Sequence, residues 1–263
     1  MRSSQAISKT PRRRLPRGAL GSFSLTVSVS EFTPSGNLAP TALPSPERDL
    51  KLWWCSLARD AGAMAGLWAT LSSEEVDRAN RYGTDALRER YVAGRAALRE
   101  TLAGRLGVPP ADVVIRRGLR GRPMLEPPGQ LDFNVTHTRG VALIAHLERP
   151  GFRVGVDIEA VDRTLAHDGL ARKFLTARER ETIADLDDDG RRRAFLRLWT
   201  CKEAMSKATG DGISAPFGEI GIDRPGRLVV VEGDGPYDPA RWTLHAVDVA
   251  HELLATVAIW FAG

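Results

Sequence analysis

The stretch WTCKEAMSKATG, residues 199–210, places charged side chains among large apolar residues. Its composition favours a helix, because Ala, Met, Lys and Glu all have good helix propensity. At about 100° per residue one apolar stripe runs along this helix, and further large apolar residues lie outside the stripe. We therefore expect a helix that is buried on two sides. The charged groups of three side chains should become exposed where that burial ends: Lys202, Glu203 and Lys207.

Two interpretations of these charges remain open from the residues alone. Glu203 and Lys207 are four residues apart, so they could form an ordinary ion pair on an exposed face, contributing a few tenths of a kcal/mol. Alternatively, they could belong to a site. The second interpretation needs further polar groups from elsewhere in the chain.

A second group of acidic residues lies in FRVGVDIEAVDR, which has the alternation of a strand. Side chains on a strand point alternately to opposite faces, so Asp157 and Glu159 should share one face, about 7 Å apart. The apolar residues between them should face the other way. A solvated strand face would show the same pattern, so this motif alone does not define a site.

Together, these carboxylates favour a magnesium site. Asp157, Glu159 and Glu203 are hard oxygen ligands, which suit Mg²⁺, or Mn²⁺ in its place, far better than zinc. Magnesium usually completes its shell with water and substrate phosphates. Lys202 and Lys207 would then serve as point charges for phosphate oxygens.

Composition limits the alternatives. The chain has 263 residues and 43% hydrophobic content, which supports a packed core. Residues 1–50 contain seven basic and three acidic residues, and the remainder contains 30 of each, so the body is neutral. A neutral body argues against a large nucleic-acid surface. No apolar run approaches the roughly 20 residues of a membrane span, and two distant cysteines indicate reduced thiols in a cytoplasmic protein.

The chain divides into an extension and two halves. Residues 1–50, basic and then rich in Pro and Ser, predict a disordered extension. A strand at KLWWCSLA should open an N-terminal half, residues 51–153, whose helices begin near Ser72 and end at Gly107. Residues 154–263 should form a C-terminal half, helical from 168 to 208 and closed by strands. Strands around long helical segments in each half predict an α+β fold.

The order of four motifs is specific. GRP at 121–123, FNVTHT at 133–138, GVDIE at 155–159 and LWTCKEAMSKATGDGI at 198–213 together resemble the Sfp-type 4′-phosphopantetheinyl transferases. The resemblance covers about residues 70–215. It implies a monomeric pseudo-dimer of two similar α+β halves, with coenzyme A and Mg²⁺ held in the cleft between them.

The resemblance also implies residue roles. Asp157, Glu159 and Glu203 correspond to the carboxylates on the metal side, and Glu203 also corresponds to the general base. The remaining matched positions concern coenzyme A: Lys202 and Lys207 at its phosphates, Thr136 and His137 lining its site, Arg122 near the adenine, and Arg78 and Arg90 at the 3′-phosphate. Judged by its residue type and place alone, His137 would more often be a hydrogen-bonded histidine at a strand end. Glu179 matches an acidic position whose role stays open.

The implied activity is transfer of the 4′-phosphopantetheine arm from coenzyme A to a serine of an apo acyl or peptidyl carrier protein. A metal-dependent nuclease or nucleotide pyrophosphatase is one alternative, since acidic clusters beside a lysine also hydrolyse phosphodiesters. A carrier-binding module that has lost catalysis is another. The presence of all the matched carboxylates and lysines argues against the inactive module.

Overall fold

Two 22-residue helices, α3 (Asp85–Leu106) and α6 (Asp188–Thr209), organise the fold. Each begins at a side-chain cap, and each ends at a glycine in the left-handed region, Gly107 at φ 70° and Gly210 at φ 86°. Only glycine adopts that conformation without steric cost, so both helices stop there. The prediction that the helices of the N-terminal half end at Gly107 is confirmed by the end of α3. The computed structural model describes residues 39–58, 61–118, 120–129, 131–163, 167–223 and 227–263.

The N-terminal half is built around an antiparallel sheet with the strand order β1-β2-β6-β5, and a short β3-β4 hairpin stands apart from it. Gly83 lies between two of its helices, α2 and α3. Its elements are β1 (Thr41–Leu43), β2 (Leu50–Ser56), α1 (Ala61–Trp68), α2 (Ser73–Asn80), α3, the 3₁₀ turn η1 (Pro110–Asp112), β3 (Ile115–Arg117), β4 (Pro123–Leu125), β5 (Leu131–Thr138) and β6 (Val141–Glu148).

The C-terminal half has a sheet with the order β10-β11-β7 and a second short hairpin, β8-β9. Its elements are β7 (Phe152–Ala160), α4 (His167–Phe174), α5 (Ala177–Ala184), α6, the 3₁₀ turns η2 (Gly212–Ser214) and η3 (Phe217–Glu219), β8 (Gly221–Asp223), β9 (Val229–Glu232), the 3₁₀ turns η4 (Gly235–Tyr237) and η5 (Pro239–Arg241), β10 (Trp242–Val247) and β11 (Leu253–Phe261).

The two halves repeat one plan. Apart from the extra strand β1, each has one strand, three helices, a short hairpin and two closing strands. The last strand pairs with the strand before the helices, β6 with β2 and β11 with β7. The middle helices match in detail, because α2 and α5 are both eight residues long and both begin with a capping box. The boxes pair Ser72 with Glu75 and Thr176 with Glu179. The expected α+β fold of two similar halves is confirmed.

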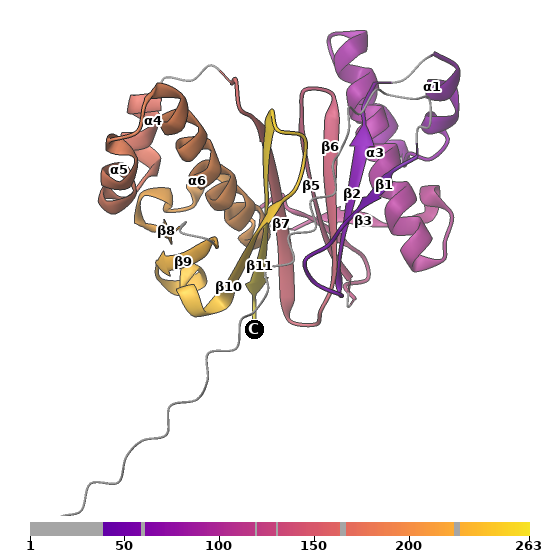
Figure 1. The fold of residues 1–263 in the computed structure, drawn as a ribbon. Coiled ribbons are helices and arrows are strands. Elements are labelled where there is room, and N and C mark those ends of the chain that lie inside the picture. The colour runs from indigo at the N-terminus through magenta and orange to yellow at the C-terminus, as the bar shows by residue number, and fades with distance from the viewer. Residues whose placement is uncertain (1–38, 59–60, 119, 130, 164–166, 224–226) are drawn as a thin grey trace, which may run out of the picture. The chain divides into compact units, whose positions relative to one another are not determined.

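The layers follow from where the apolar residues lie. One hydrophobic cluster joins residues of β2 and β6 to residues of β7 and β11, so the two sheets share a core. A second cluster lies between α3 and the first sheet, and a third lies under α6. The helices therefore cover the outer faces of both sheets, as Figure 1 shows. Within the described residues, no helix is both long and apolar enough to cross a membrane.

The fold begins earlier than the sequence predicts. The strand β1 lies inside the segment expected to be a disordered extension, and it pairs with β2. Glu47 and Asp49 also form ion pairs with Arg149 at the turn between the halves. Short polar segments of this kind carry no periodic signal, so the extension cannot be separated from the fold by composition. Residues 1–38 of the expected extension lie outside the described residues.

The strand β7 lies unusually close to the helix α6. A Cβ atom added at Gly155 would stand 1.8 Å from the carbonyl oxygen of Ala204 and 2.7 Å from the amide nitrogen of Ala208. No side chain fits in that space, so glycine is required at this point of β7. The contact fixes the position of the acidic face of β7 against the last turns of α6.

The seam between the two sheets is made by side chains. The strands β5 and β7 lie beside each other without a shared backbone ladder. Instead, the Val154 amide donates to Asp132 Oδ2 at 2.7 Å, and the Val156 amide donates to Asn134 Oδ1 at 3.1 Å. These bonds satisfy the edge of β7 and hold the halves in register.

Replacing Gly155 with Ala should destabilise the fold strongly. The new methyl group cannot avoid backbone atoms of α6, so we expect a loss of about 4 kcal/mol or more in the free energy of unfolding, measured by urea denaturation. Gly104→Ala is the matched control, because its added Cβ meets no atom within 4 Å. The control should gain up to about 1 kcal/mol. Equal stability of the two variants would contradict the required close approach.

Candidate functional site

A cavity of about 570 Å³ opens where the seam meets α6. Asp157 and Glu159 of β7 line it, as the strand alternation predicts, while Val154, Val156 and Ile158 belong to the core between the sheets. From the N-terminal half, Thr136 and His137 line the same cavity, and Lys207 reaches it from α6 together with Arg139 and Arg163 from flanking turns. The cavity therefore combines acidic and basic groups from both halves.

Lys207 ties these groups together. Its Nζ donates to Asp157 Oδ1 at 2.7 Å, to the Thr136 hydroxyl at 3.0 Å and to the Val156 carbonyl at 3.2 Å. The Thr136 hydroxyl in turn donates to Asp157 Oδ1 at 3.2 Å. The other oxygen, Asp157 Oδ2, is buried and accepts no hydrogen bond from the described residues. A buried carboxylate oxygen without a partner is costly, so this atom marks a position suited to a ligand.

Glu159 and Glu203 both lie close enough to Asp157 to be affected by its negative charge. Burial, and then the charge of Asp157, raise the pKa of Glu159 and of Glu203 above their usual range. Glu159 Oε1 accepts hydrogen bonds from Arg163 and from the Trp199 indole. The ordinary surface pair between Glu203 and Lys207 is not formed, because the Lys207 ammonium binds Asp157 instead.

These carboxylates fit a hard cation. Among the described residues, no three Asp, Glu, His or Cys side chains converge closely enough to enclose an ion by themselves. Three carboxylates nevertheless interact here, and Asp157 Oδ2 has a free coordination position. This set suits an ion that takes one or two protein oxygens and completes its shell with phosphate and water, as Mg²⁺ does.

A second cavity, of about 590 Å³, adjoins the first. Both are lined by Val135 and His137, so they meet along β5. Five arginines line the second cavity: Arg78 of α2, Arg90 and Arg95 of α3, and Arg116 and Arg117 of β3, of which Arg95 is paired with Glu75. Its walls also include the aromatic rings of Tyr82 and Tyr91. Clustered guanidinium groups beside aromatic rings suit a phosphorylated nucleoside.

The structure brings together most of the residues expected at the coenzyme A phosphates. Arg78 also lies 5.6 Å from the centre of the Tyr91 ring, a cation–π arrangement. Burial, and then the charge of Lys207, lower the pKa of His137, which favours the neutral imidazole. Arg116 and Arg117 were missed by sequence reasoning. The only signal for them was two adjacent arginines in a short predicted strand, which is typical of many solvated hairpins.

Lys202 lies outside both cavities, and the prediction that its ammonium group is exposed is wrong. Its side chain is 0% exposed, and Nζ donates to Glu179 Oε2 at 2.6 Å and to the carbonyls of Phe174 and Phe217, both at 2.8 Å. Burial lowers the pKa of Lys202. This placement does not fit the expected role as a phosphate ligand, because all three donors of the ammonium are used in the core.

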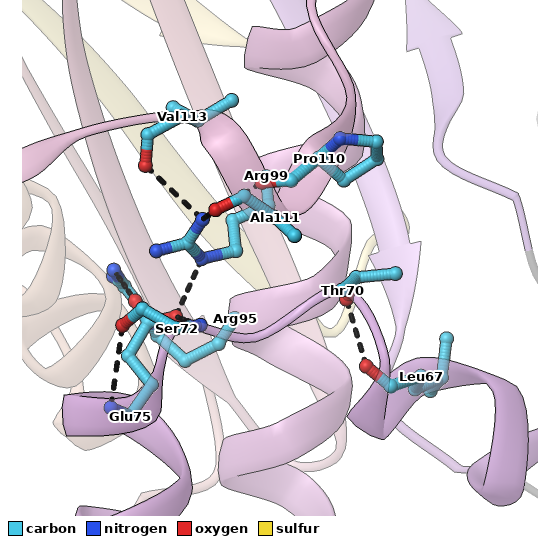
Figure 2. Close-up of polar contacts among 9 residues, drawn as sticks. All are labelled: Leu67, Thr70, Ser72, Glu75, Arg95, Arg99, Pro110, Ala111 and Val113. Carbon is cyan, nitrogen blue, oxygen red and sulfur yellow. Dashed lines mark hydrogen bonds and ion pairs between the residues drawn. The ribbon is translucent and has the colours of Figure 1, made fainter.

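The N-terminal half contains a counterpart of this buried pair. Arg99 occupies the same position in α3 that Lys202 occupies in α6, fourteen residues after the first residue of the helix. As Figure 2 shows, Arg99 binds Glu75 of the α2 capping box and the carbonyls of Pro110, Ala111 and Val113. Glu179 therefore has the role of Glu75: it caps a helix and neutralises a buried cation.

Arg122 is likewise committed to the fold. It is 7% exposed and forms a bidentate ion pair with Asp132, at 2.6 and 3.0 Å. The same guanidinium donates to the Lys207 carbonyl and the Val154 carbonyl, both at 2.9 Å. This does not fit the expected contact with adenine, because the guanidinium is saturated by partners from both halves.

Known proteins share this architecture. The 4′-phosphopantetheinyl transferase superfamily profile matches residues 153–258, and the profile for the N-terminal part of 4′-phosphopantetheinyl transferases matches residues 60–148. The chain is 38% identical to the 4′-phosphopantetheinyl transferase HetI of Nostoc sp. over 187 residues, which cover 67% of this chain and 78% of HetI. It is 30% identical to a phosphopantetheinyl transferase of Thraustochytrium sp. over 216 residues, which cover 74% of this chain and 72% of that protein.

Among solved structures, a holo-(acyl-carrier-protein) synthase from Bacillus anthracis in complex with coenzyme A is 20% identical. The match covers 42% of this chain and 96% of that one, with a TM-score of 0.35.

Two similar α+β halves with a shared cleft are the architecture of a class of group-transfer enzymes. The sequence similarity identifies which family of that class is present. The chain belongs to the 4′-phosphopantetheinyl transferase superfamily. It is an enzyme that transfers 4′-phosphopantetheine from coenzyme A to apo carrier proteins.

Lys202→Met should unfold the C-terminal half more readily. Removing the ammonium leaves Glu179 as a buried carboxylate without its counter-charge, so we expect a loss of about 3–5 kcal/mol in urea denaturation. The double variant Lys202→Met with Glu179→Gln should recover part of this loss, since no buried charge then remains. If Lys202→Met kept full stability and lost only affinity for coenzyme A, the ammonium would have to reach the site.

Proposed function

We propose that the transfer takes place in the two joined cavities, with coenzyme A lying across His137. The observation that carries this proposal is their complementary chemistry: arginines line one cavity, and carboxylates with Lys207 line the other. A nucleotide with a 3′-phosphate would occupy the arginine cavity, so that its pyrophosphate reaches the carboxylates. The cavities meet at Val135 and His137, which supports one continuous ligand.

Arg90 and Arg78 would bind the 3′-phosphate, with Arg116 and Arg117 adding charge from β3. Arg90 lies on α3 and Arg78 on α2, on walls of the same cavity. Both side chains belong to exposed residues, so they are available to a ligand that enters from solvent. Guanidinium groups suit phosphate because they donate two parallel hydrogen bonds. The neutral His137 imidazole would donate one further N–H to the pyrophosphate.

Asp157 and Glu159 would hold Mg²⁺, with Glu203 as the third carboxylate beside it. Bound there, the ion would supply Lewis-acid stabilisation of charge on the pyrophosphate. Lys207 keeps Asp157 in place through Oδ1 and leaves Oδ2 unpartnered. Its ammonium also stands at the cavity wall, where it would stabilise negative charge on phosphate oxygens as the reaction proceeds.

The reaction is a displacement at phosphorus. The hydroxyl oxygen of the carrier serine forms a bond to the phosphorus that bears the pantetheine arm, and the bond from that phosphorus to the bridging oxygen breaks. Adenosine 3′,5′-bisphosphate leaves with the bond's electron pair. Glu203 would take the serine proton, a role that suits a carboxylate whose pKa is raised by burial and by Asp157.

The alternatives fit the described residues less well. A nuclease would need a basic track for a phosphate backbone, whereas the arginines of α2, α3 and β3 line a single cavity. A carrier-binding module without catalysis would have no need for Asp157, Glu159 and Glu203 to lie within reach of one another's charge, since like charges repel. The site is built from both halves of one chain, which supports a monomer.

Glu203→Gln tests the catalytic assignment. If Glu203 is the base or a metal ligand, turnover should fall by roughly a hundredfold or more, about 3 kcal/mol in barrier, because the amide neither accepts the proton nor carries charge. Mass spectrometry of an apo carrier incubated with coenzyme A and Mg²⁺ measures the rate, and thermal melting reports the fold. Glu100→Gln is the matched control, since Glu100 occupies the corresponding position in α3. An unchanged rate in folded Glu203→Gln would remove Glu203 from the chemistry.

Arg90→Ala tests the nucleotide cavity. We expect the affinity for coenzyme A to fall about tenfold, and that for dephospho-coenzyme A to change little, because only the former carries the 3′-phosphate. Calorimetric titration of both ligands gives the comparison. Arg88→Ala is the control on the same helix, since Arg88 pairs with Asp85 and is not part of the cavity wall. Equal losses for both ligands would assign the 3′-phosphate to another arginine.

A further inference from the structure

The indole of Trp199 contacts a carboxylate of the candidate metal site. Trp199 lies on α6, and its Nε1 donates to Glu159 Oε1 at 3.2 Å. The Glu159 side chain is 12% exposed, and Arg163 donates to the same oxygen from the turn after β7. A glutamate side chain has several rotamers, and a donor fixed in the core selects among them. Trp199 itself is half-buried and is not part of the cavity wall, so it touches the site only through Glu159.

Aromatic rings hold the indole in place. Its ring packs edge-on against Phe174 at 4.9 Å between centres, against Phe217 at 5.7 Å, and stacks on Phe195 at 6.3 Å. Phe174 ends α4 and Phe217 begins η3, so segments on either side of α6 in the sequence meet at Trp199. A ring packed on several sides has little freedom to turn its N–H away from the carboxylate.

The buried ammonium of Lys202 fixes the same two phenylalanines. Its Nζ binds the backbone carbonyls of Phe174 and Phe217, the residues whose rings pack on Trp199. The third donor of the ammonium binds Glu179. A chain of contacts therefore runs from the buried ion pair through two aromatic rings to the indole and then to Glu159.

We propose that Trp199 is a positioning residue that orients the Glu159 carboxylate toward the metal ion, and that Lys202 holds Trp199 through Phe174 and Phe217. This inference rests on the proposed function, because it takes Glu159 as a metal ligand. It gives Lys202 an indirect role in the chemistry without contact to substrate. Hydrogen-bond donors behind a carboxylate ligand fix its direction and raise metal affinity.

The internal repeat supports a specific role for the indole. The position of Trp199 in α6 corresponds to Ala96 in α3, eleven residues after the first residue of each helix. Ala96 is 0% exposed, so the N-terminal half fills this place with a methyl group. The buried cation is present in both halves, while the indole is present only in the half that carries the acidic strand.

Trp199→Phe tests the proposal, because the substitution keeps an aromatic ring in the cluster and removes only the N–H and one of the two fused rings of the indole. Mn²⁺ is the probe, titrated by electron paramagnetic resonance into the full chain with coenzyme A bound. We expect about a tenfold loss of Mn²⁺ affinity. In turnover, the Mg²⁺ concentration for half-maximal rate should rise by a similar factor, and the rate at saturating Mg²⁺ should recover.

Trp242→Phe is the matched control. Its indole Nε1 donates to the backbone carbonyl of Pro236 at 2.9 Å instead of to a carboxylate, and its ring stacks on other aromatic rings. Trp242 belongs to β10 and is not part of either cavity wall. Its Mn²⁺ affinity should equal that of the unmodified chain. Calorimetric binding of coenzyme A without metal, and thermal melting, should be unchanged in Trp199→Phe relative to this control.

Glu159→Gln separates failure of the inference from failure of the proposed function. With Glu159 as a ligand, Glu159→Gln lowers Mn²⁺ affinity, and adding Trp199→Phe to it causes no further loss. Unchanged affinity in Glu159→Gln would overturn both. A loss in Glu159→Gln with unchanged affinity in folded Trp199→Phe, or equal losses from Trp199→Phe in both backgrounds, would overturn the inference alone.

Discussion

The close approach of β7 to α6 at Gly155 determines the geometry of the whole site. Because no Cβ stands between the strand and the Ala204 carbonyl, the acidic face of β7 lies directly against the turn that carries Glu203 and Lys207. Lys207 then reaches Asp157 at 2.7 Å. A larger residue would push the strand outward and separate groups that act together. The position of the carboxylates is thus set by backbone packing, and their side chains only complete it.

The two halves use one scaffold for different chemistry. In both, a capping-box glutamate neutralises a buried cation of the long helix. The C-terminal half also has a cavity of about 420 Å³ beside α5 and β8, in the place that the arginine cavity holds beside α2 and β3. By helix and strand position, Arg78, Arg116 and Arg117 correspond there to Thr182, Ile222 and Asp223. The C-terminal cavity lacks cations at these three positions, so we expect phosphate recognition to rest with the N-terminal half.

The sequence predicts this fold well where a local rule is decisive. Ser72 and Gly107 mark helix ends, and the alternation around Asp157 places its face correctly, because caps and strand periodicity depend on neighbouring residues only. It predicts Lys202 and Arg122 poorly. For Lys202, the helical pattern gives the direction of the side chain but does not show whether other segments cover it. For both cations, the hydrogen-bond partners come from segments distant in the chain. The proposed role of Arg116 and Arg117 depends on the β3-β4 hairpin lining the same cavity as α2 and α3, which the sequence does not indicate.

The seam explains why both halves must be present for the reaction. Lys207 of the C-terminal half donates to Thr136 of the N-terminal half, and Arg122 of the N-terminal half donates to the Val154 and Lys207 carbonyls in return. These bonds cross the seam on either side of Asp157, so the position of that carboxylate depends on both halves at once. In the proposed binding mode, a nucleotide in the arginine cavity would place its pyrophosphate against carboxylates that its adenosine does not reach. The seam consists of directional hydrogen bonds from particular side chains, whereas a backbone ladder could shift by a residue or more, so the register of β5 against β7 is fixed. The distance from a nucleotide in the arginine cavity to the carboxylates would be fixed in the same way.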